Sequence, residues 1–244
     1  MTRPGPSPGQ VARYLRQQGE LGGNELFLDQ LGRGEAISLT QGMATGGKTD
    51  PVPEAESGQL PQDYEVLRAE AHDCRKCTLA NTRQHVVFSD GNPAARLMVV
   101  GEAPGAQEDK TGLAFVGPAG KLLDLLLASV DLTRKTSTYI CNVLKCRPPG
   151  NRNPLPDEIE ACTPFLRRQI ELVSPRAILA VGTFSGQFLS GKALPLGRLR
   201  GEVYSYEGVP VVVTYHPAAL LRNPGWTRAT WDDLQLLRQV MDGA

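Results

Sequence analysis

The sequence predicts an α/β fold, a three-layer αβα sandwich around a central, mainly parallel four-stranded sheet. Four short runs are mostly apolar, and residues 97–100 form an unbroken apolar run, as strands buried on both faces do. Helical patterns separate these runs, and strands that alternate with helices are typical of parallel sheets covered on both sides. With 41% hydrophobic and 21% charged residues, the composition is that of an ordinary globular protein. The predicted strands are residues 97–100, 138–143, 177–181 and 209–215.

An N-terminal extension precedes the predicted domain. Residues 40–62 are rich in Gly, Pro, Ser, Thr and Glu and hold almost no large apolar side chains. Such a segment cannot bury enough surface to order itself, which indicates a linker. We therefore divide the chain into a poorly ordered extension and linker, residues 1–61, in which residues 10–18 could form a short helix, and a folded domain, residues 62–244.

The helices are predicted from periodicity and from residues that begin or end helices. Pro156 and two acidic residues open one segment, as the first turn of a helix prefers. Gly182 closes the third strand, and Thr230 is a candidate cap for the last helix. The predicted helices are residues 64–72, 118–130, 156–173, 183–189 and 231–241.

The turn after the first strand is the most informative stretch. Gly101, Pro104 and Gly105 force the chain to turn sharply at the carboxyl end of a buried strand. In open parallel sheets this end is where ligands bind. Glu102 adds a carboxylate there, and Phe115 brings an aromatic ring shortly before the next helix. A plain strand–turn–helix connection needs neither residue, so the pattern favours a ligand crevice.

Two polar residues stand at the carboxyl ends of other predicted strands. Asn142 lies near the end of the second strand, and His216 directly follows the fourth. Parallel strands bring their carboxyl ends to one edge, so both side chains can reach the same crevice. Taken alone, an Asn at a strand end is more often a turn or capping residue, and an isolated His more often has a structural role.

Four of the five cysteines have a spacing that suits metal binding. Cys74 and Cys77 form a close pair, while Cys146 and Cys162 lie far along the chain. Four thiols can bind zinc or an iron–sulfur cluster, and the spacing does not distinguish between them. Cys141 lies within a predicted strand and is expected in the core. An odd number of cysteines without an export signal favours a reducing cytosol over disulfides.

Taken together, these motifs resemble those of the iron–sulfur family 4 uracil-DNA glycosylases. The resemblance covers roughly residues 62–242, and the motifs occur in the family's order. The residues that carry it are Gly101-Glu102-Ala103-Pro104-Gly105, Phe115, Asn142, Lys145-Cys146-Arg147-Pro148-Pro149-Gly150-Asn151-Arg152 and His216-Pro217-Ala218-Ala219-Leu220-Leu221-Arg222.

The resemblance implies a DNA repair enzyme that flips uracil out of DNA and hydrolyses its N-glycosidic bond, leaving an abasic site. Phe115 would stack on the base, Asn142 would read it, and His216 would stabilise the departing anion. Glu102 would orient water or stabilise the sugar cation. The crevice motifs hold no lysine that could form an imine, so strand cleavage is not expected. The implied uracil site comprises Gly101, Glu102, Ala103, Phe115, Asn142 and His216, with Glu102 and His216 as the catalytic residues.

The same resemblance implies DNA contacts and a cofactor. Residues 134–152 contain five basic residues and no acidic ones, which suits phosphate contact beside a pocket. Residues 218–222 are expected as a loop whose leucines enter the base stack. The expected DNA-binding residues are Lys145, Arg147, Arg152, Leu220, Leu221 and Arg222. The expected cofactor is a [4Fe–4S] cluster on Cys74, Cys77, Cys146 and Cys162, with zinc as the alternative.

Three other functions are alternatives at this point. A sister group of glycosylases with broader base specificity shares the cluster but differs around the first motif, where Gly105 and Asn142 argue against it. A relative that traps uracil covalently needs a histidine in a basic loop, whereas residues 194–200 contain none. The third is a non-catalytic iron–sulfur module that binds DNA.

The sequence also bounds the partners and the compartment. The formal net charge is zero, so composition by itself does not indicate a nucleic-acid-binding protein. No apolar run approaches the ~18 residues that a membrane span needs. We expect a cytoplasmic monomer that acts on uracil-containing DNA, single- or double-stranded, without a membrane partner.

Overall fold

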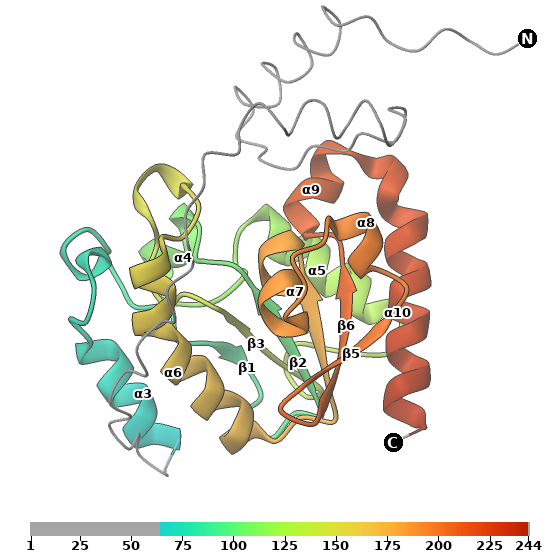
Figure 1. The fold of residues 1–244 in the computed structure, drawn as a ribbon, viewed down its shortest axis with the longest axis horizontal. Helices are drawn as coiled ribbons and strands as arrows, with labels where there is room; N and C mark the ends of the chain where they lie inside the picture. Colours follow the sequence, from blue (N-terminus) through green and yellow to red (C-terminus); the bar gives the residue numbers. More distant parts are fainter. Residues whose placement is uncertain (1–63, 244) are drawn as a thin grey trace, which may run out of the picture. The chain divides into compact units, whose positions relative to one another are not determined.

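The computed structural model describes residues 64–243. The predicted extension, residues 1–61, lies outside the described residues, and so does the short helix expected over residues 10–18. The described part of the chain is an α/β domain with helices on both sides of one sheet (Figure 1). This architecture confirms the predicted fold class.

Six strands form the sheet, in the order β1-β3-β2-β4-β6-β5. The four inner strands are parallel and correspond to the four predicted ones. The edge strands β1 and β5 pair antiparallel with β3 and β6, so the prediction of four strands omitted both edges. The strands are β1 (Asp90–Gly91), β2 (Leu97–Gly101), β3 (Thr138–Asn142), β4 (Ala177–Val181), β5 (Val203–Tyr206) and β6 (Val209–Thr214).

The helices follow the predicted alternation. Helix α6 has the predicted bounds, because a proline and an acidic first turn mark where it begins. Helices α4 and α8 were not predicted, since segments this short hold too few turns to show a hydrophobic period. The described helices are α3 (Tyr64–Asp73), α4 (Ala106–Thr111), α5 (Pro118–Ala128), α6 (Pro156–Val173), α7 (Thr183–Ser190), α8 (Leu196–Leu199), α9 (Pro217–Arg222) and α10 (Thr227–Asp242).

Each face of the sheet buries its own set of side chains. Alternate residues of the inner strands, such as Val99 and Leu179, form one apolar cluster with side chains of α5 and α10. On the other face, Gln169 of α6 donates to the Tyr139 hydroxyl at 2.7 Å, and α7 packs on β4 and β6. Two helical layers therefore enclose the sheet, and α3 lies alongside α6 (Figure 1).

Two helices near the C-terminus differ from the prediction. Residues 218–222, expected as a loop, belong to α9, which begins at Pro217; proline suits this position because its backbone angle is already helical. Helix α10 begins at Thr227, before the predicted start at residue 231. Thr230 therefore lies inside the helix, where its hydroxyl donates to the Trp226 carbonyl at 3.2 Å instead of capping it.

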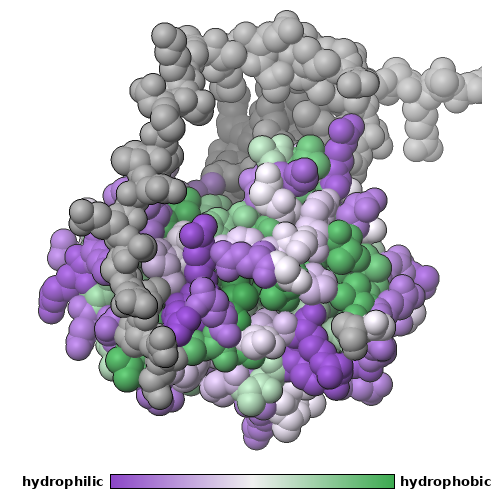
Figure 2. All heavy atoms as spheres, turned by 60° about the horizontal axis from the view of Figure 1, so that its bottom comes forward, coloured by the Kyte–Doolittle hydropathy of each residue, from purple (hydrophilic) through white to green (hydrophobic). Residues whose placement is uncertain are grey.

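The carboxyl ends of the inner strands lie on the side of α9, at the top of Figure 1. Gly101 of β2 stands opposite Asn142 of β3, and Val181 of β4 stands opposite Thr214 of β6. The residues that follow these strands are thereby brought to one edge. Figure 2, which brings the bottom of Figure 1 forward, shows hydrophilic side chains interspersed with groups of hydrophobic ones. None of the described helices is long and apolar enough to cross a membrane.

Candidate active site

Gly101 is the residue at which two of the side chains expected to bind uracil come together. A Cβ atom added there would lie 2.4 Å from Oδ1 of Asn142 and 2.7 Å from Cζ of Phe115. The missing side chain at residue 101 therefore gives room to a carboxamide and an aromatic ring that come from two other segments. The strand register explains the first approach, because Gly101 and Asn142 are partners in the parallel pair β2–β3.

Asn142 is fixed through its backbone, while its side-chain carboxamide makes no hydrogen bond to the other described residues. Asn142 is 2% exposed, and its backbone carbonyl accepts a hydrogen bond from Nζ of Lys145 at 2.6 Å. Within residues 64–243, no hydrogen bond reaches its side-chain amide. Its amide atoms are not among the buried polar atoms that lack a partner, so they remain open to a ligand that brings one donor and one acceptor.

His216 presents a defined tautomer to the same edge. It caps α9, and its Nδ1 accepts from the backbone N–H of Ala218 at 3.1 Å. A neutral imidazole carries one proton, so Nε2 is the donor. The pKa of His216 is lowered to about 4, mainly by burial and then by the positive charge of Arg222, while the carboxylate of Glu108 acts in the opposite direction. The half-buried ring is therefore neutral at neutral pH and offers one N–H.

Phe115 connects the two halves of the crevice. Its ring stacks on that of His216, with the centroids 5.5 Å apart and the planes at 30°. The backbone of Phe115 has a φ of 53°, in the left-handed region that non-glycine residues rarely adopt, at a cost of about 1 kcal/mol or more. Gly120 contributes to this shape, because a Cβ there would overlap the Phe115 carbonyl at 1.6 Å.

Two charged side chains hold the loop around Phe115. The Oε1 atom of Glu108 accepts from the backbone N–H groups of Val116 and Gly117, each at 2.9 Å. Arg134 donates to the carbonyls of Ala114 and Phe115 at 2.9 and 2.8 Å. Both contacts are to backbone, so the loop conformation depends on these two residues whatever the identity of the side chains at 114, 116 and 117.

Glu102 and Ala103 continue the turn after Gly101. Both residues are half-buried, and the Glu102 carbonyl accepts from the backbone N–H of Leu144 at 3.0 Å. Ala103 packs against the apolar group that contains Cys146 and Cys162. The strand ends thus bring together the six residues expected to form the uracil site, and the turn links that site to the cysteines.

The four cysteines expected to bind metal lie in two adjoining apolar groups. Cys77, Cys146 and Cys162 belong to one group, and Cys74 packs against the neighbouring one between α3 and α6. Arg83 donates to the Cys146 sulfur and the backbone N–H of Lys145 donates to the Cys162 sulfur, both at 3.3 Å. N–H donors of this kind stabilise thiolates, which are the form that binds metal.

The four expected metal ligands all lie among the described residues. In residues 64–243 no three Cys, His, Asp or Glu side chains are close enough to hold an ion. The donor chemistry nevertheless fits a metal, since all five cysteines are free thiols. Burial raises the pKa of Cys77 and Cys146, and that of Cys162 to about 12, so these thiols stay neutral without a cation. Cys141 is fully buried in β3, in agreement with the expected core position.

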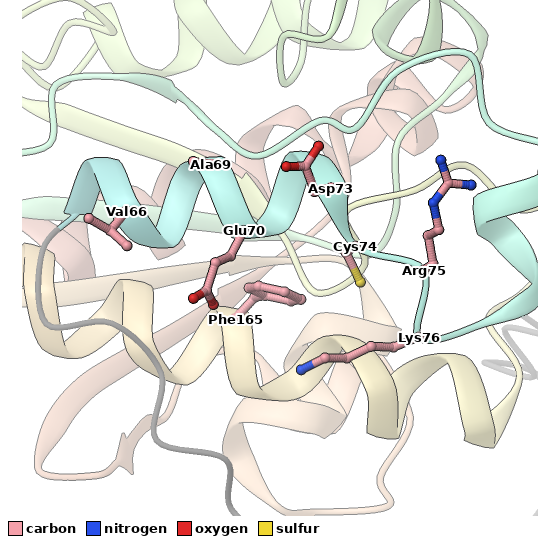
Figure 3. Close-up of a pocket in the computed structure, with 8 residues that line it drawn as sticks. All are labelled: Val66, Ala69, Glu70, Asp73, Cys74, Arg75, Lys76 and Phe165. Carbon is pink, nitrogen blue, oxygen red and sulfur yellow. The ribbon is translucent and has the colours of Figure 1, made fainter.

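A hollow beside Cys74 opens between α3 and α6 (Figure 3). The Nζ atom of Lys76 lies 5.4 Å from the centre of the Phe165 ring there. The hollow contains none of the residues expected to bind uracil, so it is separate from the crevice. Its lining residues are Val66, Ala69, Glu70, Asp73, Cys74, Arg75, Lys76 and Phe165.

Two of the residues expected to bind phosphates have internal tasks instead. Lys145 is 2% exposed, and its ammonium group points at the Asn142 carbonyl, so it cannot reach DNA in this conformation. Arg152 makes a bidentate ion pair with Glu158, which is fully buried at the start of α6. Lys145 is therefore withdrawn from the expected DNA contacts, and Arg152 has a structural role whether or not it also meets a phosphate.

The other expected DNA contacts differ in exposure. Leu220 is 3% exposed and Leu221 is 51% exposed, so only the second can enter a base stack; Leu220 belongs to the core. Arg222 is exposed on the same helix, α9. Arg147 is half-buried, and its Nε donates to the side chain of Asn151 at 2.7 Å.

Comparison with known proteins decides the family. A model of the uracil DNA glycosylase superfamily matches residues 88–235. The type-4 uracil-DNA glycosylase of Archaeoglobus fulgidus is 45% identical over 163 residues, with 64% of this chain and 81% of the relative covered. The chain belongs to the uracil-DNA glycosylase superfamily.

Two relatives from one organism, Pyrobaculum aerophilum, bear on the subgroup of this superfamily member. Its type-4 uracil-DNA glycosylase is 42% identical over 170 residues, covering 66% of this chain and 86% of the relative. Its type-5 uracil-DNA glycosylase is 35% identical over 151 residues, covering 55% of this chain and 66% of the relative. The chain is thus more similar to the type-4 enzyme of this organism than to the type-5 enzyme.

Sequence reasoning missed three residues that shape the crevice of this superfamily member. Glu108 and Arg134 hold the Phe115 loop, and nothing in their sequence context distinguishes them from surface charges. Gly182, recognised only as the end of a strand, has a φ of 100°, and a Cβ there would lie 3.2 Å from Cβ of His216. A glycine directly after a buried strand is a sign of a close approach, but it does not identify the neighbour.

Proposed function

We infer that this chain is a uracil-DNA glycosylase: it removes uracil from DNA by hydrolysing the N-glycosidic bond, and it leaves an abasic site. The observation that carries this inference is the meeting of Asn142 and Phe115 at Gly101, with His216 stacked on the Phe115 ring, at the carboxyl edge of the sheet. The type-4 names of its relatives support the same function. Lys145 is the one lysine in the crevice motifs, and its Nζ is buried and hydrogen-bonded to the Asn142 carbonyl, so we expect no imine and no cleavage of the DNA strand.

The proposed reading of the base rests on Asn142. Its carboxamide has an acceptor and a donor side by side, and uracil presents the complementary N3–H donor and O4 acceptor. Cytosine presents the reverse pattern at these positions and would leave a buried amide unpaired, which is a strong ground for rejection. Phe115 supplies the aromatic face on which a flipped base stacks.

The proposed chemistry separates a base anion from a sugar cation. As the bond between C1′ and the base nitrogen breaks, negative charge gathers on uracil O2, where the Nε2–H of His216 and backbone N–H groups of residues 101–103 can stabilise it. Water then bonds to C1′ and releases a proton. Glu102 is the residue we propose to orient that water or to stabilise the cation, because its carboxylate belongs to the same turn.

The experiment that tests the function uses an oligonucleotide with a single uracil. Incubation followed by alkaline cleavage should give a cut at that position only, and omission of alkali should leave the strand intact. The same oligonucleotide with thymine or hypoxanthine serves as the control for base specificity. Binding without any alkali-sensitive product would favour the non-catalytic DNA-binding module, and release of the control bases would favour the sister group.

A pH prediction follows from the neutral state of His216. Because its folded pKa is about 4, we expect the single-turnover rate of uracil release to stay flat as pH is lowered through 6.5, the usual value for histidine, and to fall only on approach to 4. Protonation at low pH would place a proton on Nδ1 and break the cap to Ala218. A rate that changes with a midpoint near 6.5 would contradict this assignment.

The same shift predicts the sign of a stability effect. Between pH 6.5 and about 4 the unfolded chain binds a proton at residue 216 that the folded chain excludes. The free energy of unfolding contributed by this residue should therefore decrease as pH falls through that window. His216→Asn removes this contribution while keeping a capping side chain, so it is the matched control for thermal unfolding measured at both ends of the window.

We propose that Cys74, Cys77, Cys146 and Cys162 hold a [4Fe–4S] cluster, with zinc as the alternative metal. The support is the donor set of free thiols and the N–H groups directed at two of the sulfurs. When bound, such a group would tie the end of α3, the segment after β3 and α6 to one another. It would act as a structural element, and none of the chemistry above passes through it.

Metal content tests this proposal directly. The protein purified without oxygen should be brown, with broad visible absorbance. It should contain about four irons per chain, as one [4Fe–4S] cluster requires. Cys162→Ala should lose the colour and the iron, whereas Cys141→Ala, the matched control, should keep both and lose only ~1–3 kcal/mol of stability or less. A colourless, fully active protein with stoichiometric zinc would rule out the cluster.

The proposed DNA interface lies on α9. Leu221 is exposed and apolar, as a residue that fills the gap left by a flipped base must be, and Arg222 beside it is an exposed cation suited to phosphate. Both belong to the short helix that His216 caps. We propose that a monomer of this chain acts in the reducing cytosol on uracil in single- or double-stranded DNA.

A further inference from the structure

We propose that Arg134 is a positioning residue for uracil excision: it fixes the backbone of Phe115 and so holds the ring on which the base stacks. This inference rests on the proposed function, in which Phe115 touches the base. Sequence analysis places Arg134 in a basic run suited to phosphates. The structure instead directs its guanidinium at the protein interior, where the side chain is 17% exposed.

The hydrogen bonds of Arg134 flank one residue on both sides. The Ala114 carbonyl belongs to the peptide group before Phe115, and the Phe115 carbonyl belongs to the peptide group after it. Holding both groups restrains both backbone dihedrals of residue 115 at once. This restraint matters because φ of Phe115 is 53°, a value that an unrestrained phenylalanine would leave.

The guanidinium is itself fixed in place. Arg134 forms ion pairs with Asp90 of β1 and Asp124 of α5, both at 2.9 Å. Two carboxylates and two carbonyls therefore accept from one planar guanidinium, whose N–H donors point in fixed directions. A lysine ammonium could not reproduce this arrangement, because its charge is compact and its donors are not held in a plane. The edge of the sheet and a neighbouring helix thus determine where the Phe115 loop lies.

The ring position has a direct consequence for the crevice. The Phe115 ring contacts the ring of His216 and the space above Gly101. A rotation of the Phe115 backbone would move the ring away from both contacts. Arg134 hydrogen-bonds neither His216 nor Asn142, and of the residues expected to bind uracil it bonds only Phe115, so we expect its effect on the reaction to pass through that residue.

A double-mutant cycle tests this path. Single-turnover rates of uracil release are measured for the wild type, Phe115→Ala, Arg134→Ala and the double variant. We expect Phe115→Ala and Arg134→Ala each to slow the reaction roughly 10- to 100-fold, since small misplacements in an active site are costly. In the Phe115→Ala background, Arg134→Ala should slow it by less than about twofold, because the two residues act through one ring.

Asp124→Asn is the matched control for the ion pair. It removes the negative charge paired with Arg134 but keeps an oxygen that can accept from Nε, and it leaves the bonds to both carbonyls, so the rate should stay within about twofold of the wild type. Binding to a uracil-free duplex over a range of salt concentrations supplies a second measurement. Arg134→Ala should leave the salt slope unchanged, whereas loss of a phosphate contact would lower it by about one. Arg134→Lys, which keeps the charge without the fork, replaces Arg134→Ala in the cycle if the latter fails to fold.

The outcomes distinguish the positioning role of Arg134 from the stacking role of Phe115. If the effects of Phe115→Ala and Arg134→Ala multiply in the double variant, or if the salt slope falls, Arg134 does not act through Phe115 and the inference is wrong. If Phe115→Ala alone leaves the rate unchanged, the stacking role of Phe115 in the proposed function is wrong instead. A cycle with strong coupling and an unchanged salt slope supports both.

Discussion

Replacement of His216 by alanine is expected to slow uracil release in a single turnover by ~10²–10³-fold, or roughly 3–4 kcal/mol, because it removes a donor that acts on charge present mainly in the transition state. Affinity for DNA should change little, since that charge is absent from the bound substrate. The two quantities are measured separately, by rapid-quench kinetics with enzyme in excess and by titration of a uracil-free duplex.

Two further variants distinguish the proposed catalytic role of the imidazole from its role as the cap of α9. His216 also caps α9 through Nδ1, so His216→Asn restores a capping acceptor without the Nε2 donor and should remain as slow as His216→Ala. His72→Ala, at an exposed position of α3, should behave as the wild type. If His216→Ala weakens DNA binding as much as it slows release, or if His216→Asn restores the rate, the histidine has only a structural role.

Gly101→Ala is expected to have the second large effect, a loss of rate on the order of 10²-fold, because it displaces two reading groups at once. The added methyl would lie 2.4 Å from Oδ1 of Asn142 and 2.7 Å from Cζ of Phe115, so at least one of them must move. Both atoms are side-chain tips, but Asn142 and Phe115 are buried, so neither side chain has open space to move into. Overpacking should also cost ~1–3 kcal/mol of stability, measured by thermal unfolding.

A second glycine provides the control for this change. Gly197 in α8 has no atom within 4 Å of its potential Cβ, so Gly197→Ala adds the same methyl without a collision. We expect its rate of release to equal that of the wild type. A Gly101→Ala enzyme that keeps wild-type rates would show that Asn142 and Phe115 are not needed where the structure places them.

The core of the fold could be predicted from sequence because strands buried on both faces are made mostly of consecutive apolar residues. The strands β2, β3 and β4 are buried at every residue, and β2 and β4 accordingly hold no polar side chain, while β3 is apolar between Thr138 and Asn142. The two edge strands show no such apolar run. Strand β5 alternates between exposed and half-buried residues, and β1 has only two residues, so neither could be separated from a loop by pattern alone.

The candidate site could be predicted in part for a related reason. The rule that parallel strands bring their carboxyl ends together places Gly101, Asn142 and His216 at one edge, and the structure has them there. What a charged side chain does depends on contacts far along the chain, which the sequence does not display. Lys145 and Arg134 belong to the same basic run, yet both donate to backbone carbonyls inside the protein.

A crystal structure of the protein with uracil, the product of the proposed reaction, tests the central claim most directly. The account predicts the base at the carboxyl edge of the sheet, against Phe115, with N3 and O4 within hydrogen-bond distance of the Asn142 carboxamide and O2 within that distance of Nε2 of His216. Uracil bound without contact to Asn142, or found instead in the hollow between α3 and α6, would contradict it.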